Sequence, residues 1–197
     1  MSLFRNIFNM DTTAPQDAPA SPDAPLPALG AGETDSVKIL AAALSAMPPA
    51  RARYVAAFAY LLGRAANATG GMSDAERAAI LKIAEAGGLE PATAPMVGDL
   101  AAALAGDFGA TEDYLVTREF KAISTMEERQ RLIRCCFLVM SADDEIDATE
   151  SWLANRMSEE LDVERPDLNA IRTEFYDQIS GVRAAREVAQ AGDARQA

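Results

Sequence analysis

Apolar residues recur at the spacing of an α-helix along most of the chain between residues 34 and 180. One face of a helix over about residues 50–68 carries Tyr54, Val55, Phe58, Leu61 and Leu62. A later stripe, which ends in an acidic turn, comprises Leu132, Ile133, Cys136, Phe137 and Met140. This period of 3.6 residues is typical of amphipathic helices, and no convincing alternation of apolar and polar residues indicates a strand. The pattern therefore predicts an all-α bundle of about eight helices.

Three capping boxes mark the expected starts of helices. In a capping box, the N-cap side chain accepts from the amide three residues on, and the side chain of that residue accepts from the N-cap amide. The pairs with this spacing are Ser73 with Glu76, Thr125 with Glu128, and Asp147 with Glu150. They predict helices that begin directly after residues 73, 125 and 147.

The two ends of the chain differ in composition from its centre. Residues 1–10 carry a short amphipathic pattern, and residues 11–33 hold five of the ten prolines. Such a proline-rich segment buries too little apolar surface to become ordered. We predict an amphipathic arm and disordered linker at 1–33, one helical domain at 34–180, and a frayed tail at 181–197. The first ten residues are expected to be a mobile or docked arm, or a weak peripheral membrane contact.

An internal repeat becomes visible when the chain is shifted by 74 residues, which aligns residues 68–89 with 142–163. Ser73 then falls on Asp147 and Glu76 falls on Glu150, and the apolar position Ile83 falls on Met157. The shared spacing predicts two helix–turn–helix halves related by a pseudo-twofold axis. The two turns differ in charge, because only the second one is densely acidic.

Acidic residues dominate the charge of the chain, whose formal net charge is −12. Ten acidic residues and two arginines lie between Asp143 and Asp167. Nucleic acid is excluded as a partner by this balance, because its phosphates would be repelled. Cations and basic protein surfaces are the partners that the charge favours.

The acidic turn is the candidate metal site. Its carboxylates are Asp143, Glu145, Asp147 and Glu150, and the first-half equivalent is Glu76. Calcium and magnesium bind several oxygen ligands of this kind. The spacing is not that of an EF-hand, because position six from Asp143 is Ala148 rather than glycine. The alternative is purely structural, since carboxylates also stabilise the N-terminus of a helix as caps.

Other chemistry is restricted by what the chain lacks. It contains no histidine. This excludes catalysis by a serine–histidine or cysteine–histidine pair, and it leaves few suitable ligands for zinc. The two cysteines, Cys135 and Cys136, are adjacent on a predicted helix, where their side chains diverge and a disulfide is not expected. No apolar run reaches the length of a membrane span. We therefore expect a cytoplasmic protein without enzymatic activity, in which any membrane contact is confined to residues 1–10.

Four segments together resemble the tellurite-resistance TerB family: Phe120–Ile123, Glu127–Glu128, Arg131–Cys136, and Ser141–Asp147 with Glu150. The likeness covers about residues 50–165 and is stronger in the second half. It implies an all-helical fold with an internal repeat, in a small soluble bacterial protein or module linked to stress resistance. Modules similar to TerB also occur in membrane-associated co-chaperones.

The resemblance also implies an acidic surface that binds metal. By position, Asp143, Asp147 and Glu150 match acidic positions of the family, and Glu76 matches the glutamate of its first half. The chain departs from the family pattern where Asp144 replaces the turn glycine. It departs again at residue 69, where a threonine replaces the first-half aspartate.

The sequence therefore supports two hypotheses of function. The first is a non-enzymatic stress-response module whose acidic surface binds a divalent cation (calcium or magnesium), a protein partner, or both. The second is a scaffolding or co-chaperone-like interaction domain near the inner face of the membrane, with no metal site.

Overall fold

The computed structural model of the chain describes residues 42–86, 94–104 and 110–193. The predicted arm and linker at 1–33 lie outside these ranges, so both stay predictions. Eight helices, α3 to α10, have both ends within the described residues. The prediction of an all-α fold is confirmed, because the described residues contain helices and no strand.

Helix α3, Pro49–Ala66, runs through the centre of the molecule and is buried along most of its length. It contacts α5 (Ala94–Leu104), α6 (Ala110–Ile123) and α7 (Met126–Met140). Small residues allow these close approaches: a Cβ atom added at Gly63 would lie 2.7 Å from the carbonyl oxygen of Ala101 on α5. Six alanines of α3 are fully buried: Ala52, Ala56, Ala57, Ala59, Ala65 and Ala66.

The other helices surround α3 in two groups. Helix α4 (Asp74–Ala86) packs with α5 on one side, and α7 packs with α8 (Ala148–Glu160) and α9 (Arg165–Glu174) on the other. Aromatic contacts join α3 to α6, where Tyr54 and Phe58 lie against Phe120. Phe137 on α7 stacks on Phe175 at the end of α9, with ring centroids 5.3 Å apart.

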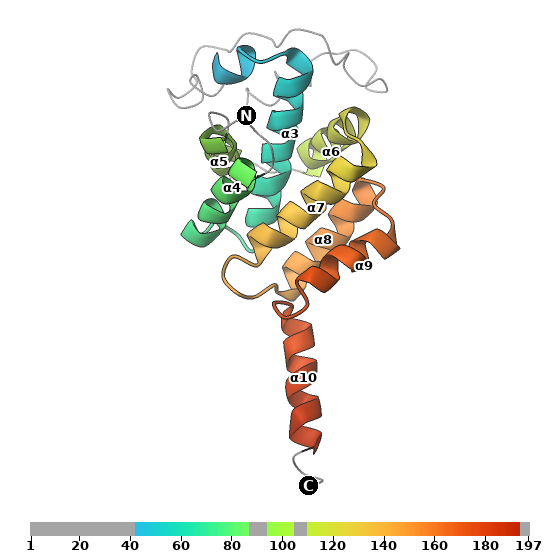
Figure 1. The fold of residues 1–197 in the computed structure, drawn as a ribbon. Helices are drawn as coiled ribbons and strands as arrows, with labels where there is room; N and C mark the ends of the chain where they lie inside the picture. Colours follow the sequence, from blue (N-terminus) through green and yellow to red (C-terminus); the bar gives the residue numbers. More distant parts are fainter. Residues whose placement is uncertain (1–41, 87–93, 105–109, 194–197) are drawn as a thin grey trace.

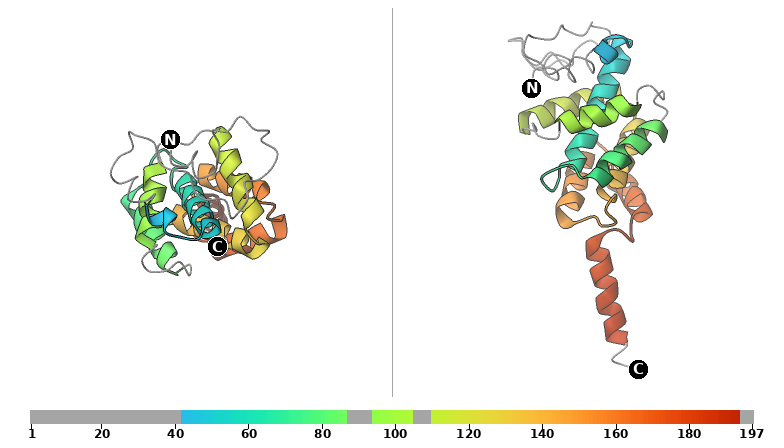
Figure 2. Two further views of the ribbon diagram at one scale, coloured as in Figure 1. Left: turned by 90° about the horizontal axis from the view of Figure 1, so that it is seen from above. Right: turned by 90° about the vertical axis from the view of Figure 1, so that its left-hand side faces the viewer.

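The C-terminal segment differs from its prediction. A frayed tail was expected from residue 181, whereas Ser180–Asp193 form helix α10, which projects away from the other helices (Figures 1 and 2). Alanine and arginine have a high intrinsic helix propensity. Ile179 anchors its start through an isolated parallel bridge to Ile146. Among the described residues, no helix has the length and apolarity needed to cross a membrane.

Candidate functional site

Two helix N-termini from different parts of the chain line one pocket. The loop from α3 to α4 and the loop from α7 to α8 lie on the same side of the molecule (Figure 1). Between them is a pocket of about 260 Å³. Its lining residues are Thr69, Gly71, Ser73, Glu76, Asp143, Glu145, Asp147 and Glu150. All five predicted ligand candidates are therefore brought together.

Reciprocal capping boxes place the glutamates of this pocket. The Ser73 amide donates to Oε2 of Glu76 at 2.7 Å, and the Glu76 amide donates to Oγ of Ser73 at 3.1 Å. The Asp147 amide donates to Oε2 of Glu150 at 2.9 Å, and the Glu150 amide donates to Oδ1 of Asp147 at 2.8 Å. Both predicted boxes are confirmed, and each satisfies two amides that a helix start would otherwise leave free.

Main-chain hydrogen bonds to the segment before α10 hold the second turn in place. The Ile146 amide donates to the Gln178 carbonyl at 2.7 Å, and the Ser180 amide donates to the Ile146 carbonyl at 3.0 Å. Ile146 is fully buried between acidic neighbours. Asp144 has φ of 69°, a left-handed conformation that aspartate tolerates better than most residues. The aspartate at the position of the family's turn glycine thus keeps the turn.

In the first turn, two glycines adopt the positive φ values. Gly70 and Gly71 have φ of 100° and 155°, values that residues with a Cβ atom rarely adopt. The turn contributes one carboxylate to the pocket, from Glu76, together with the uncharged Thr69 and Ser73. The pocket is therefore two-sided in geometry and asymmetric in charge.

Burial and mutual repulsion dominate the electrostatics of the pocket. Glu76 and Glu150 are only 7% and 5% exposed, and the eight lining residues include no lysine or arginine. Burial raises the pKa of Glu150 from 4.5 to about 7, against the lowering effect of the Asp147 amide. The charges of Asp147, Asp143 and Glu76 raise this pKa further. The pocket therefore favours any process that brings positive charge to Glu150.

The donor atoms of the pocket suit a hard cation, although they do not form a closed ligand set. Glu76, Asp147 and Glu150 each use one carboxylate oxygen in a capping box, and their second oxygens accept no hydrogen bond from the described residues. Carboxylate oxygens are the ligands that calcium and magnesium prefer. As the side chains stand, no three or more His, Cys, Asp or Glu residues of the described ranges are grouped closely enough to hold a metal ion.

Sequence reasoning missed one aspect of this site: it did not assign Thr69, Gly71 or Ser73 to the pocket. The shift of 74 residues was the available signal, because it pairs Ser73 with Asp147 and Glu76 with Glu150. The pseudo-twofold relation that the shift predicts stays a prediction.

The fold and the site together define an all-helical protein in which two capped helix starts meet at an acidic pocket. The family model of tellurite resistance protein TerB matches residues 55–173, which is more than half of the chain. The chain belongs to the TerB family. Neither the curated proteins nor the solved structures that were searched contain a match.

Proposed function

We propose that this protein is a non-enzymatic stress-response module of the TerB family whose acidic pocket binds a divalent cation. The observation that carries the proposal is the meeting of five carboxylates from two loops, without any basic residue, in one pocket of about 260 Å³. Two of the five, Asp143 and Glu145, have no part in a capping box, so capping alone does not explain them.

The ion that suits the pocket is calcium or magnesium, held weakly and partly hydrated. Two glutamates are fixed by their boxes, and the carboxylates do not converge on one point. A cation here would therefore have one or two carboxylate ligands and several waters, which is the usual environment of magnesium in proteins. Asp143, Glu145, Asp147, Glu150 and Glu76 are the residues that would hold it.

Thermal unfolding of chelator-treated protein tests this proposal. A cation that binds only the folded chain stabilises it by about 2.7 kcal/mol at a free concentration of 100 times Kd. We expect calcium or magnesium to raise the Tm in a saturable way, and zinc to have no specific effect. The rise should be lost in the double variant Asp143→Asn/Glu150→Gln, and it should weaken as the pH falls below about 7, where Glu150 becomes protonated.

Glu128→Gln is the matched control for this experiment. Glu128 occupies the same position in the capping box of α7, but it does not line the pocket. The cation-dependent rise should therefore be unchanged in this variant. A rise that survives in the double variant, or no rise at millimolar cation, would contradict the cation site.

A second candidate function is a scaffolding or co-chaperone-like interaction domain with no metal site. What favours it is the absence of a ready group of three metal-ligating side chains in the described ranges. In this case the pocket and the exposed Asp143, Asp144 and Glu145 would contact lysines or arginines of a protein partner. We place the protein in the cytoplasm under both proposals. Peripheral membrane contact through residues 1–10 belongs only to the second.

A further inference from the structure

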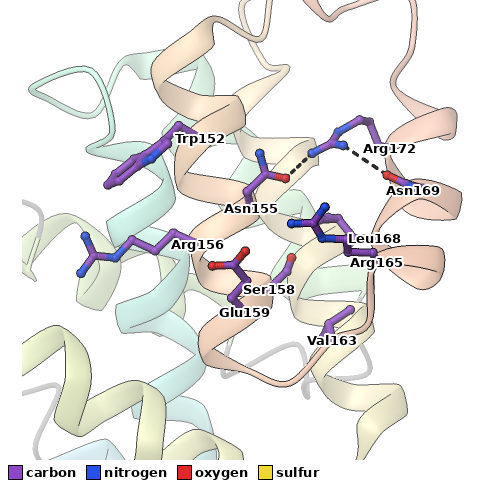
Figure 3. Close-up of a pocket in the computed structure, with 10 residues that line it drawn as sticks. All are labelled: Trp152, Asn155, Arg156, Ser158, Glu159, Val163, Arg165, Leu168, Asn169 and Arg172. Atoms are coloured by element: carbon purple, nitrogen blue, oxygen red, sulfur yellow. Dashed lines mark hydrogen bonds between the residues drawn. The ribbon is translucent and has the colours of Figure 1, made fainter.

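A second and larger pocket of about 620 Å³ lies between α8 and α9. Figure 3 shows its lining, in which the guanidinium groups of Arg165 and Arg172 extend from α9 toward Asn155 of α8. Trp152 and Arg156 form the other end of the pocket. Its volume is in the range of small-molecule sites, roughly 300–1,000 Å³.

The charge of this pocket is opposite to that of the protein. Three arginines and one glutamate line it, in a chain whose net charge is −12. One of the three, Arg156, is paired with Glu160 at 2.9 Å, as Arg64 is with Glu160 and Arg134 is with Glu174 elsewhere. Within the described residues, Arg165 and Arg172 have no carboxylate within 4.0 Å.

Neutral amides orient one of these arginines. Arg172 donates from Nη2 to Oδ1 of Asn155 at 2.5 Å and from Nη1 to Oδ1 of Asn169 at 3.3 Å. These contacts restrict the guanidinium without neutralising its charge. Arg165 lies seven residues earlier on the same helix, and two helical turns place both arginines on one face. Arg165 is exposed and has no described polar contact, so it has no evident structural role.

We propose that the pocket between α8 and α9 is a binding site for a small oxyanion or for a ligand that carries one, such as a phosphate monoester. Guanidinium groups bind phosphate and carboxylate oxygens through paired N–H donors, and the geometry is strongest when the arginine is already oriented. Arg172 supplies the oriented group and Arg165 the second, exposed group. Glu159, which lines the same pocket, opposes the anion and weakens its binding.

Trp152 allows a direct test, because it is the only tryptophan of the chain and it lines the pocket with 57% of its surface exposed. Its fluorescence can be followed during titration with inorganic phosphate, tellurite or glycerol 3-phosphate, with sodium chloride at the same ionic strength as the reference. Preference for glycerol 3-phosphate would identify an organic phosphate as the ligand. Preference for phosphate or tellurite would identify a free oxyanion.

We expect saturable binding that is at least about tenfold weaker in Arg172→Gln and in Arg165→Gln, since each removes one charged fork. Glu159→Gln should bind more tightly than the wild type. Arg131→Gln is the matched control, because Arg131 is an exposed arginine of α7 outside the pocket, and its affinity should equal that of the wild type.

The Arg165→Gln variant keeps the test valid if Arg172→Gln alters the packing of α9, because Arg165 makes no contact that the fold requires. Calorimetry confirms the affinities independently of the tryptophan. The proposal is overturned by no saturable signal above the chloride reference, or by equal affinities in the wild type and Arg165→Gln. Because the acidic pocket shares no residue with this one, failure of either proposal leaves the other intact.

Discussion

Replacement of Glu150 by glutamine tests the electrostatics of the acidic pocket most directly. Glu150 is 5% exposed, and burial raises its pKa from 4.5 to about 7, with further raising by Asp147, Asp143 and Glu76. Glutamine keeps an oxygen that can accept from the Asp147 amide, so the capping box is retained while the charge is removed. The variant therefore isolates the free energy of placing a negative charge at this position.

The sign of the effect follows from the direction of the shift. A carboxyl with a higher pKa in the folded chain binds its proton more tightly there, so its stabilising contribution is complete below the unfolded pKa. That contribution is lost as the pH rises from 4.5 through 7. A shift of this size corresponds to about 3 kcal/mol. Because the pocket opens to solvent, which screens the charges, we expect about 1–3 kcal/mol.

Urea unfolding in the presence of chelator, at steps from about pH 5 to about pH 9, measures this contribution. The gain in the free energy of unfolding of Glu150→Gln over the wild type should be smallest at about pH 5, and it should reach about 1–3 kcal/mol at about pH 9. Glu128→Gln, in the exposed box of α7, should show no comparable gain. Parallel pH profiles for wild type and Glu150→Gln would refute the reasoning.

Two further predictions concern the core. Gly63→Ala should destabilise the protein by about 1–3 kcal/mol in urea unfolding, although alanine is favoured over glycine in a helix by about 1 kcal/mol. The reason is that the new Cβ atom would lie 2.7 Å from the backbone of Ala101, whereas the control Gly181→Ala meets nothing within 4 Å. Burial raises the pKa of Cys135 to about 11 and also raises that of Cys136, so neither thiol should react with a disulfide reagent near neutral pH until denaturant is added. Rapid labelling of the folded protein would contradict this placement.

The features that the sequence predicted correctly are those with a local cause. Apolar residues at helical spacing place α3 and α7, and all three capping boxes are present, because each depends on residues only three positions apart. The expected helix over 50–68 corresponds to Pro49–Ala66. The acidic turn was also recognisable, since its carboxylates lie within eight residues.

Contacts between distant segments could not be predicted in the same way. Arg64 on α3 binds Glu160 through two hydrogen bonds, of 2.6 and 3.2 Å, and lies 3.2 Å from Asp113. These residues are 96 and 49 positions away from Arg64, and no periodicity connects them. The same applies to the hydrogen bond from Arg172 on α9 to Asn155 on α8. The spacing of seven residues between Arg165 and Arg172 on α9 was visible in the sequence, but the partner face on α8 was not.

The three capping boxes show why the acidic pocket is more than a pair of helix caps. In a capping box, glutamine can take the place of glutamate three residues after the N-cap. The box therefore needs no charge at that position. In the exposed box of α7, the charge of Glu128 meets solvent. In the boxes of α4 and α8, Glu76 and Glu150 are buried and lie in a pocket with three further carboxylates. This arrangement raises the pKa of Glu150 and so destabilises the ionised fold, a cost that glutamine would avoid and that a bound cation would offset.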